Sequence, residues 1–216
     1  MAPLARDLKA HYGIEFFSIG GGLGIVYEAS IKSGHKDWWQ SSTTTNARWH
    51  QLSIQEYVDA LLQPLGDLGL KILLEPGRLL VGNAGVLLTR VRYMKTTGQK
   101  KFAIVDAGMN DLIRPALYDA WHDVRNVGTT TGKSMRYEIV GPVCETGDFL
   151  ARDRELALNE GDVLAIMSTG AYGMSMSSNY NTRLRAAEIM VDGDAVHVIR
   201  DRERVEQLLA AEHILP

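Results

Sequence analysis

Two short motifs in the first third of the chain combine residues that could bind an anion and hold a proton. Gly20-Gly21-Gly22 follows the apolar run Ile14–Ile19, and Glu75-Pro76-Gly77-Arg78 follows Lys71–Leu74. Glycine amides can approach a phosphate closely because no side chain stands in the way. If both runs are parallel strands, their carboxyl ends meet at one edge and bring the glycines and Glu75 together. Taken singly, each motif is also typical of a tight turn, the second with a surface ion pair.

The glycine cluster does not match either of the common nucleotide-binding fingerprints. In a G-x-G-x-x-G pattern the third glycine would fall on Ile25 or Tyr27, and the Lys-Ser/Thr pair of a P-loop is missing. The sequence therefore favours neither a dinucleotide site nor a nucleotide triphosphate site.

Three later segments carry further candidates. Arg114 and Tyr118 are four residues apart, so on one helical turn they would share a face and could bind a carboxylate together; the alternative is a loop with a surface arginine.

Cys144 is followed by Glu145, and acidic neighbours disfavour a thiolate, so this thiol is better suited to donating a proton. The alternative for a lone cysteine is a small buried apolar residue. The loop after residue 169, which carries Tyr172, is costly to order without a ligand or partner.

The elements that must position these residues change in type near residue 85. A helix over Leu4, Leu8 and Tyr12 ending at Gly13, and a second helix capped by Ser53, alternate with the two apolar runs, which predicts an α/β unit over residues 1–85. A polar stretch over residues 28–50 predicts a surface excursion. Short β-like runs predict an all-β unit over residues 86–216: 86–93, 101–106, 135–140, 163–167 and 187–191. Residues 202–215 predict a final helix.

Composition excludes several classes of protein. Lys plus Arg is 23 and Asp plus Glu is 26, a net charge of −3, and the pI is about 6.1, which argues against nucleic-acid binding. No run approaches the roughly 18 apolar residues of a membrane span, and the N-terminus does not resemble a secretory signal. One cysteine excludes an internal disulfide and, with these absences, favours a cytoplasmic protein. The six histidines have no metal-ligand spacing, so we expect no metal site.

Five motifs, in order, resemble those of the diaminopimelate decarboxylases: FFSIGGGLGI, LLEPGR, DAGMNDLIRPALY, VGPVCETGDF and GAYGMSMSSNYN. These enzymes belong to the fold-type III pyridoxal-phosphate enzymes, with the ornithine and arginine decarboxylases. The resemblance implies the C-terminal part of a cofactor-binding TIM-type (β/α)8 barrel over residues 1–85. It implies a β-barrel or sandwich domain with a terminal helix, as in alanine racemase and ornithine decarboxylase, over residues 86–216. The implied activity is that of a carboxy-lyase that converts meso-diaminopimelate to L-lysine and CO₂, the last step of lysine biosynthesis, in a homodimer with shared active sites.

The resemblance also implies a role for each candidate residue. The phosphate of pyridoxal 5'-phosphate would bind Gly20, Gly21 and Gly22, and Glu75 would pair with the pyridine nitrogen. The remaining cofactor contacts would come from Gly77, Arg78 and Tyr172. The substrate carboxylate distant from the reacting carbon would be held by Arg78, Arg114 and Tyr118. The distal amino-acid centre would be read by Glu145, with Tyr172 touching substrate as well, and Cys144 would act across the dimer interface in protonating the carbanion.

The chain departs from this family in length and in small details. Family members are about twice as long, and none of the eight lysines here lies in a motif matching the lysine that holds the cofactor covalently. We therefore expect a C-terminal half that is inactive alone. Thr146 replaces the usual serine of Cys-Glu-Ser, which keeps the hydroxyl, and Leu184 replaces the proline of Asn-x-Arg-Pro-Arg.

Two alternatives stay open. One keeps the chemistry and changes the substrate to ornithine, arginine or carboxynorspermidine; against it, Arg114, Tyr118 and Glu145 suit a distal end that carries both a carboxylate and an amine. The other is a non-catalytic homologue that binds a partner through the dimer surface; against it, a scaffold has no use for the set Cys144, Glu75 and Tyr172.

Overall fold

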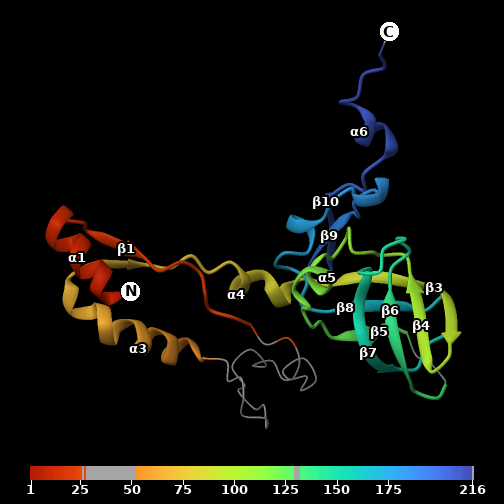
Figure 1. Ribbon diagram of the computed structural model, residues 1–216, viewed down its shortest axis with the longest axis horizontal. Coiled ribbons are helices and arrows are strands. Elements are labelled where there is room, and N and C mark those ends of the chain that lie inside the picture. The colour runs from red at the N-terminus through yellow and green to blue at the C-terminus, as the bar shows by residue number, and fades with distance from the viewer. Residues whose placement is uncertain (26, 28–51, 129–131, 216) are drawn as a thin grey trace. The chain divides into compact units, whose positions relative to one another are not determined.

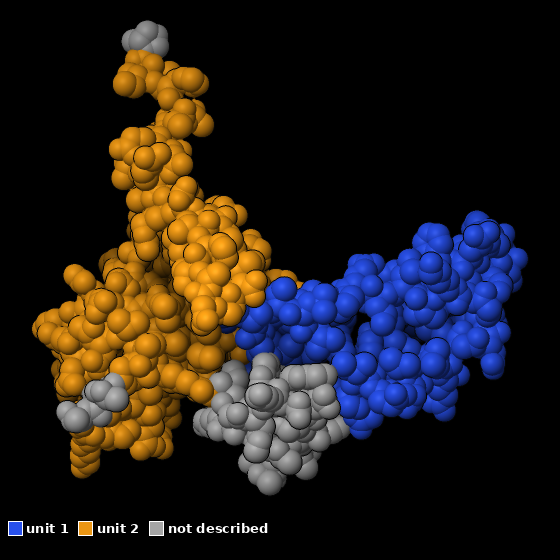
Figure 2. Space-filling model, turned by 180° about the vertical axis from the view of Figure 1, so that it is seen from behind, with its two compact units in different colours: residues 1–85 blue, residues 86–216 orange. Residues whose placement is uncertain are grey.

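The computed structural model describes residues 1–25, 27, 52–128 and 132–215. The chain divides into two compact units, residues 1–85 and 86–216 (Figures 1 and 2). The excursion expected over residues 28–50 lies outside the described residues. No helix in the described part of the chain is long and apolar enough to cross a membrane.

The first unit is organised around two short parallel strands. Strand β1 (Phe16–Ser18) pairs with β2 (Lys71–Leu73), and Phe17 lies opposite Ile72. The predicted parallel pairing is therefore confirmed. The helices of this unit are α1 (Ala2–Tyr12), α3 (Ile54–Leu65) and α4 (Arg78–Val81), with 3-10 turns at Gly66–Leu68 and Gly82–Ala84.

Helix α1 ends, and helix α3 begins, where the sequence predicts. Gly13 ends α1 in the left-handed conformation, with φ 64°. Ser53 starts α3 with a capping box: its hydroxyl accepts from the Glu56 amide at 3.2 Å, and Glu56 Oε2 accepts from the Ser53 amide at 2.7 Å. The apolar face expected on α1 is exposed in the described structure, since Leu4 and Tyr12 expose 56% and 78% of their surface.

The second unit is built on a six-stranded sheet in the order β5-β8-β3-β4-β6-β7 (Figure 1). Neighbouring strands are antiparallel except β4 and β6, which run parallel. The strands are β3 (Leu87–Thr97), β4 (Lys100–Val105), β5 (Val124–Asn126), β6 (Met135–Val140), β7 (Phe149–Leu156) and β8 (Val163–Ile166). Short helical turns lie between and after them: α5 (Arg114–Tyr118), Met174–Met176 and Tyr180–Thr182. A separate antiparallel hairpin follows, formed by β9 (Glu188–Asp192) and β10 (Ala195–Arg200).

Apolar side chains from this sheet form the core of the unit. Those exposing 1% or less of their surface include Val91, Val105, Ile139, Leu150, Leu164 and Ile166. Burial of these branched side chains is the main force holding the sheet together.

Three strands and the length of the last helix differ from the sequence prediction. Strand β7 was not predicted, because its charged residues are typical of a solvent-exposed segment. Two of its arginines instead lie over aromatic rings: the Arg152 guanidinium carbon is 3.5 Å from the Phe149 ring centroid, and that of Arg154 is 4.5 Å from the Trp121 ring centroid. Strand β5, which is only three residues long, and strand β10 were not predicted either. The helix expected over residues 202–215 is confined to α6 (Val205–Leu209), which buries none of its residues and so has no packing to extend it.

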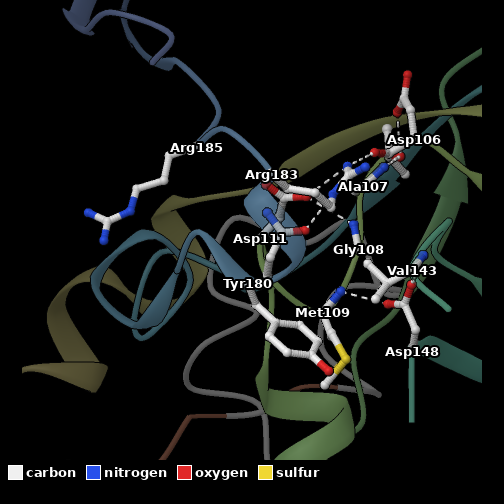
Figure 3. A network of polar contacts seen from close by, with 12 residues as sticks. Asp106, Ala107, Gly108, Met109, Asp111, Val143, Asp148, Tyr180, Arg183 and Arg185 are labelled. Carbon is white, nitrogen blue, oxygen red and sulfur yellow. Dashed lines mark hydrogen bonds and ion pairs between the residues drawn. The ribbon is translucent and has the colours of Figure 1, made fainter. Parts of the chain in front are cut away.

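One buried carboxylate joins two loops of the second unit (Figure 3). Asp148, 3% exposed, accepts from the Met109 amide at 2.6 Å through Oδ1 and from the Val143 amide at 2.8 Å through Oδ2. A Cβ on Gly141 would lie 2.3 Å from Asp148 Oδ2, so only glycine allows this approach. Burial raises the pKa of Asp148, while its two amide hydrogen bonds and Arg183 oppose that rise. Asp148 therefore fixes the segment after β4 against the turn between β6 and β7.

Arg183 joins a third loop to the same segment (Figure 3). Its Nε donates to Asn110 Oδ1 at 2.7 Å, its Nη2 donates to the Asp106 carbonyl at 2.5 Å, and Asp111 Oδ2 lies 3.8 Å from Nη2. Asp111 in turn accepts from the Gly108 amide at 2.9 Å. Residues 106–111 are thus the common support of two other loops.

We predict that Asp148→Asn destabilises the chain by about 1–3 kcal/mol, because an asparagine has one acceptor oxygen and leaves a buried amide unpaired. The measurement is urea unfolding followed by circular dichroism. Asp153→Asn is the matched control, since Asp153 is exposed and forms a surface ion pair with Arg136. Equal stabilities for Asp148→Asn and the control would contradict the role given to Asp148.

Candidate active site

The carboxyl ends of β1 and β2 bring the glycine cluster and Glu75 into contact. The Glu75 amide donates to the Gly20 carbonyl at 3.0 Å, and the Ser18 hydroxyl donates to Glu75 Oε1 at 2.5 Å. The same hydroxyl oxygen accepts from the Gly20 amide at 3.3 Å. Ser18 therefore orients the exposed carboxylate of Glu75 beside the glycines.

Backbone geometry explains two of the three glycines. Gly20 has φ 73°, and a Cβ on Gly21 would lie 2.0 Å from the Glu75 carbonyl oxygen. Gly22 has open space around it, so packing within the described residues does not require glycine there. Neither Gly21 nor Gly22 donates an amide hydrogen bond to another described residue. An anion at these strand ends would find both amides free of those partners.

Gly77 and Arg78 follow Glu75 at the start of α4. Gly77 is exposed, and Arg78 is half-buried. A Cβ on Gly82 would lie 3.5 Å from Arg78 Cγ and 2.5 Å from Ile25 Cδ1, so the stem of Arg78 packs closely within this unit. Arg78 thus leaves the same end of β2 as Glu75.

In the second unit, Arg114 and Tyr118 begin and end α5, as their spacing predicts. Arg114 exposes 6% of its surface and Tyr118 exposes 61%. Arg114 Nη1 lies 2.9 Å from His122 Nε2, and His122 Nδ1 lies 2.8 Å from the Met167 carbonyl oxygen. The guanidinium is therefore anchored, while the phenol of Tyr118 is open to solvent.

Burial lowers the pKa of His122 to about 4, with the charges of Arg114 and Arg154 acting in the same direction and the hydrogen bond to Met167 opposing. The ring is therefore neutral at neutral pH. A carbonyl oxygen can only accept, so Nδ1 carries the proton and Nε2 accepts from Arg114.

Cys144 and Glu145 lie in the turn between β6 and β7. The Glu145 amide donates to the Val143 carbonyl at 2.8 Å, and the Glu145 carbonyl accepts from the backbone amide of Asp148 at 3.0 Å. Glu145 Oε1 accepts from the Gly147 amide at 3.1 Å. Cys144 is exposed and free, so it is not the buried apolar residue of the alternative reading.

Tyr172 lies in a strained loop after β8. Both Ser168 and Tyr172 have a positive φ, at 59° and 63°, a backbone conformation that is uncommon for residues other than glycine. A Cβ on Gly173 would lie 2.3 Å from the Thr169 carbonyl oxygen, so the loop closes tightly. Strain of this kind is concentrated at functional sites. Tyr172 exposes 40% of its surface.

The candidates therefore fall into two groups, each within one unit. The first comprises Gly20, Gly21, Gly22, Glu75, Gly77 and Arg78, and the second comprises Arg114, Tyr118, Cys144, Glu145 and Tyr172. In the second group, Asp148 connects the turn of Cys144 and Glu145 to the segment that leads into α5.

Four supporting residues were missed by sequence reasoning: Ser18, His122, Asp148 and Arg183. Ser18 and Asp148 lie within the motifs FFSIGGGLGI and VGPVCETGDF, so their place beside the candidate residues was a usable signal. His122 had none, because a single histidine after a helical turn has no pattern that distinguishes an anchor from a surface residue.

A family model described as "Pyridoxal-dependent decarboxylase, C-terminal sheet domain" matches residues 18–170. Among curated relatives, the diaminopimelate decarboxylase of Pseudomonas aeruginosa is 52% identical over 94% of this chain and 45% of its own length. That of Vibrio cholerae is 48% identical over 100% of this chain and 48% of its own. The chain thus spans about half the length of the curated relatives it matches.

Solved structures give the same relationship. Diaminopimelate decarboxylase from Helicobacter pylori, complexed with L-lysine, is 38% identical with a TM-score of 0.79, covering 97% of this chain and 48% of that one. The enzyme from M. jannaschii is 36% identical with a TM-score of 0.81, covering 99% and 46%. The predicted fold class, the C-terminal part of a fold-type III enzyme, is confirmed by this similarity. This chain belongs to the family of pyridoxal-dependent decarboxylases that act on ornithine, diaminopimelate and arginine.

Proposed function

We propose that this chain forms the C-terminal half of a decarboxylase that converts meso-diaminopimelate to L-lysine and CO₂. The observation that carries the proposal is the 52% identity to the Pseudomonas aeruginosa enzyme over 94% of the chain. Relatives crystallised with L-lysine, the product of this reaction, support the same substrate.

The residues at the ends of β1 and β2 fit pyridoxal phosphate. Gly21 and Gly22 offer amide donors for a phosphate, and Glu75, oriented by Ser18, offers an acceptor for a ring nitrogen. When bound, the cofactor withdraws electrons from the carbon that loses CO₂. Glu75 would hold a proton at the pyridine nitrogen, with Gly20 completing the phosphate contacts. Gly77, Arg78 and Tyr172 would provide the remaining contacts.

The second group of residues suits the distal end of diaminopimelate. Arg114 supplies a fixed positive charge for a carboxylate, with Tyr118 as a further donor. Arg78, of the first group, is a further donor to the same carboxylate in this proposal. Glu145, an exposed carboxylate, would accept from the distal ammonium. Cys144, whose thiol is exposed, would deliver a proton to the carbon that has lost CO₂.

We propose that residues 1–85 belong to an α/β barrel and residues 86–216 to a β-domain. The division of the chain at residue 85 supports this. We further propose a cytoplasmic homodimer with shared active sites, because an exposed thiol at the site would work in a reducing compartment and family resemblance gives it a role across a dimer interface.

The proposal is tested by CO₂ release from the full-length enzyme, meaning this chain preceded by the N-terminal half that its relatives possess. We expect turnover of meso-diaminopimelate and none of ornithine, arginine or carboxynorspermidine. Turnover of one of those three in place of diaminopimelate would assign a different substrate. No turnover of any of them by a folded, cofactor-loaded protein would favour the non-catalytic alternative.

Arg114→Ala in the full-length enzyme should raise KM for diaminopimelate by roughly 10- to 100-fold, since a charge-assisted hydrogen bond contributes about 1.5–3 kcal/mol. Steady-state kinetics measure the change. Arg136→Ala is the matched control, because Arg136 makes only a surface ion pair with Asp153 among the contacts seen. Unchanged KM and kcat in Arg114→Ala would show that the distal carboxylate is bound elsewhere.

Cys144→Ala should lower kcat by at least about 100-fold, the usual contribution of a positioned proton donor, while cofactor affinity stays the same. The measurements are CO₂ release, product analysis and absorbance titration with pyridoxal phosphate. If turnover and products both match the wild type, Cys144 has no part in the proton transfer.

A further inference from the structure

The contact between Arg114 and His122 assigns a role to a residue outside the predicted site. His122 lies in the short connection between α5 and β5 and has no exposed surface. Its two ring nitrogens face opposite kinds of partner: a carbonyl oxygen at 2.8 Å from Nδ1 and a guanidinium nitrogen at 2.9 Å from Nε2. Only the neutral ring with its proton on Nδ1 satisfies both contacts.

The surroundings of His122 keep the ring in this form. Arg114 faces it from α5, and Arg154 on β7 donates through Nη2 to the His122 carbonyl at 3.0 Å. The neighbouring Asp123 carboxylate is engaged by Arg125 Nε at 2.9 Å. Two nearby positive charges and full burial all oppose a third positive charge on the imidazole.

A neutral partner has a particular consequence for a guanidinium. A carboxylate in the place of His122 would hold Arg114 equally well, but it would cancel the charge that a substrate carboxylate needs. A neutral imidazole orients the guanidinium of Arg114 through a hydrogen bond and does not neutralise its positive charge. The Met167 carbonyl, at the end of β8, prevents the ring from turning away.

We propose that His122 is a positioning residue for Arg114: as a buried neutral acceptor anchored on the Met167 carbonyl, it aligns the guanidinium for a substrate carboxylate without itself adding an opposing charge. This inference rests on the proposed function, in which Arg114 binds the distal carboxylate. It extends carboxylate recognition to a residue that contacts no substrate.

Two substitutions distinguish the roles of the two ring nitrogens of His122. His122→Asn keeps a donor near the Nδ1 position for Met167 and removes the acceptor for Arg114. His122→Gln keeps an acceptor near the Nε2 position. In the full-length enzyme we expect His122→Asn to raise KM for diaminopimelate about 10-fold or more, with kcat changed less than about 3-fold, and His122→Gln to restore KM to within about 3-fold of wild type. His197→Asn, on the exposed hairpin strand β10, is the matched control.

Binding measurements distinguish positioning from general destabilisation. By calorimetry, His122→Asn should weaken L-lysine, which keeps the distal carboxylate, by the same factor as KM, and leave cadaverine, which lacks it, unchanged. Equal weakening of both ligands would overturn the inference and assign His122 a structural role. Unchanged L-lysine affinity in His122→Asn, when Arg114→Ala weakens it, would overturn the inference alone. Unchanged affinity in Arg114→Ala would instead overturn the proposed role of Arg114, on which the inference depends.

A measurement on the unmodified protein covers the case in which His122→Asn does not fold. Nitrogen-15 NMR of the imidazole reports which ring nitrogen carries the proton. We expect a neutral ring protonated on Nδ1 throughout pH 5–8. A proton on Nε2, or a charged ring near neutral pH, would remove the acceptor from Arg114 and overturn the inference.

Discussion

The carboxylate of Asp148 is buried between two loops, where an ionised group is tolerated only if hydrogen bonds replace the water it has lost. Its two oxygens accept from the amides of Met109 and Val143, so the loops cannot separate without breaking at least one of these hydrogen bonds. The segment before α5 and the turn of Cys144 and Glu145 therefore keep a fixed relation. Arg183 adds the loop after residue 177 to the same support.

Arg114 and Asp148 show the same physical solution with opposite charges. Each is buried, and each has a neutral hydrogen-bond partner that orients it: backbone amides for Asp148 and an imidazole for Arg114. Neutral partners orient a charged group without cancelling its charge. For Asp148 the result is a fixed junction between two loops, and for Arg114 it is an oriented guanidinium, the group that we propose binds a carboxylate.

Much of the fold could be predicted because its signals are local. Gly13 and Ser53 mark helix ends through φ and capping chemistry, and the parallel pairing follows from two apolar runs separated by a helix. Strand β7 was not predicted because its arginines are typical of a solvent-exposed segment, although Arg152 and Arg154 lie over aromatic rings. The residues of α6 read as part of a longer helix, but no packing stabilises its extension.

In the candidate site, the sequence predicted which residues of the ordered motifs lie close together. It did not predict the single side chains that hold those residues in place. Glu75 and the glycines follow strands, so topology alone brings them together. His122 and Arg183 act through contacts with residues 8 and 73 positions away in the sequence, and no spacing rule indicates such contacts.

The central claim, that one carboxylate couples the two loops, is tested most directly by native-state hydrogen exchange of the Met109 and Val143 amides. If Asp148 holds both, the two amides exchange through one opening, with the same free energy and the same dependence on urea. Different free energies, with Val143 exchanging freely while Met109 stays protected, would show that the loops open independently and would contradict the account.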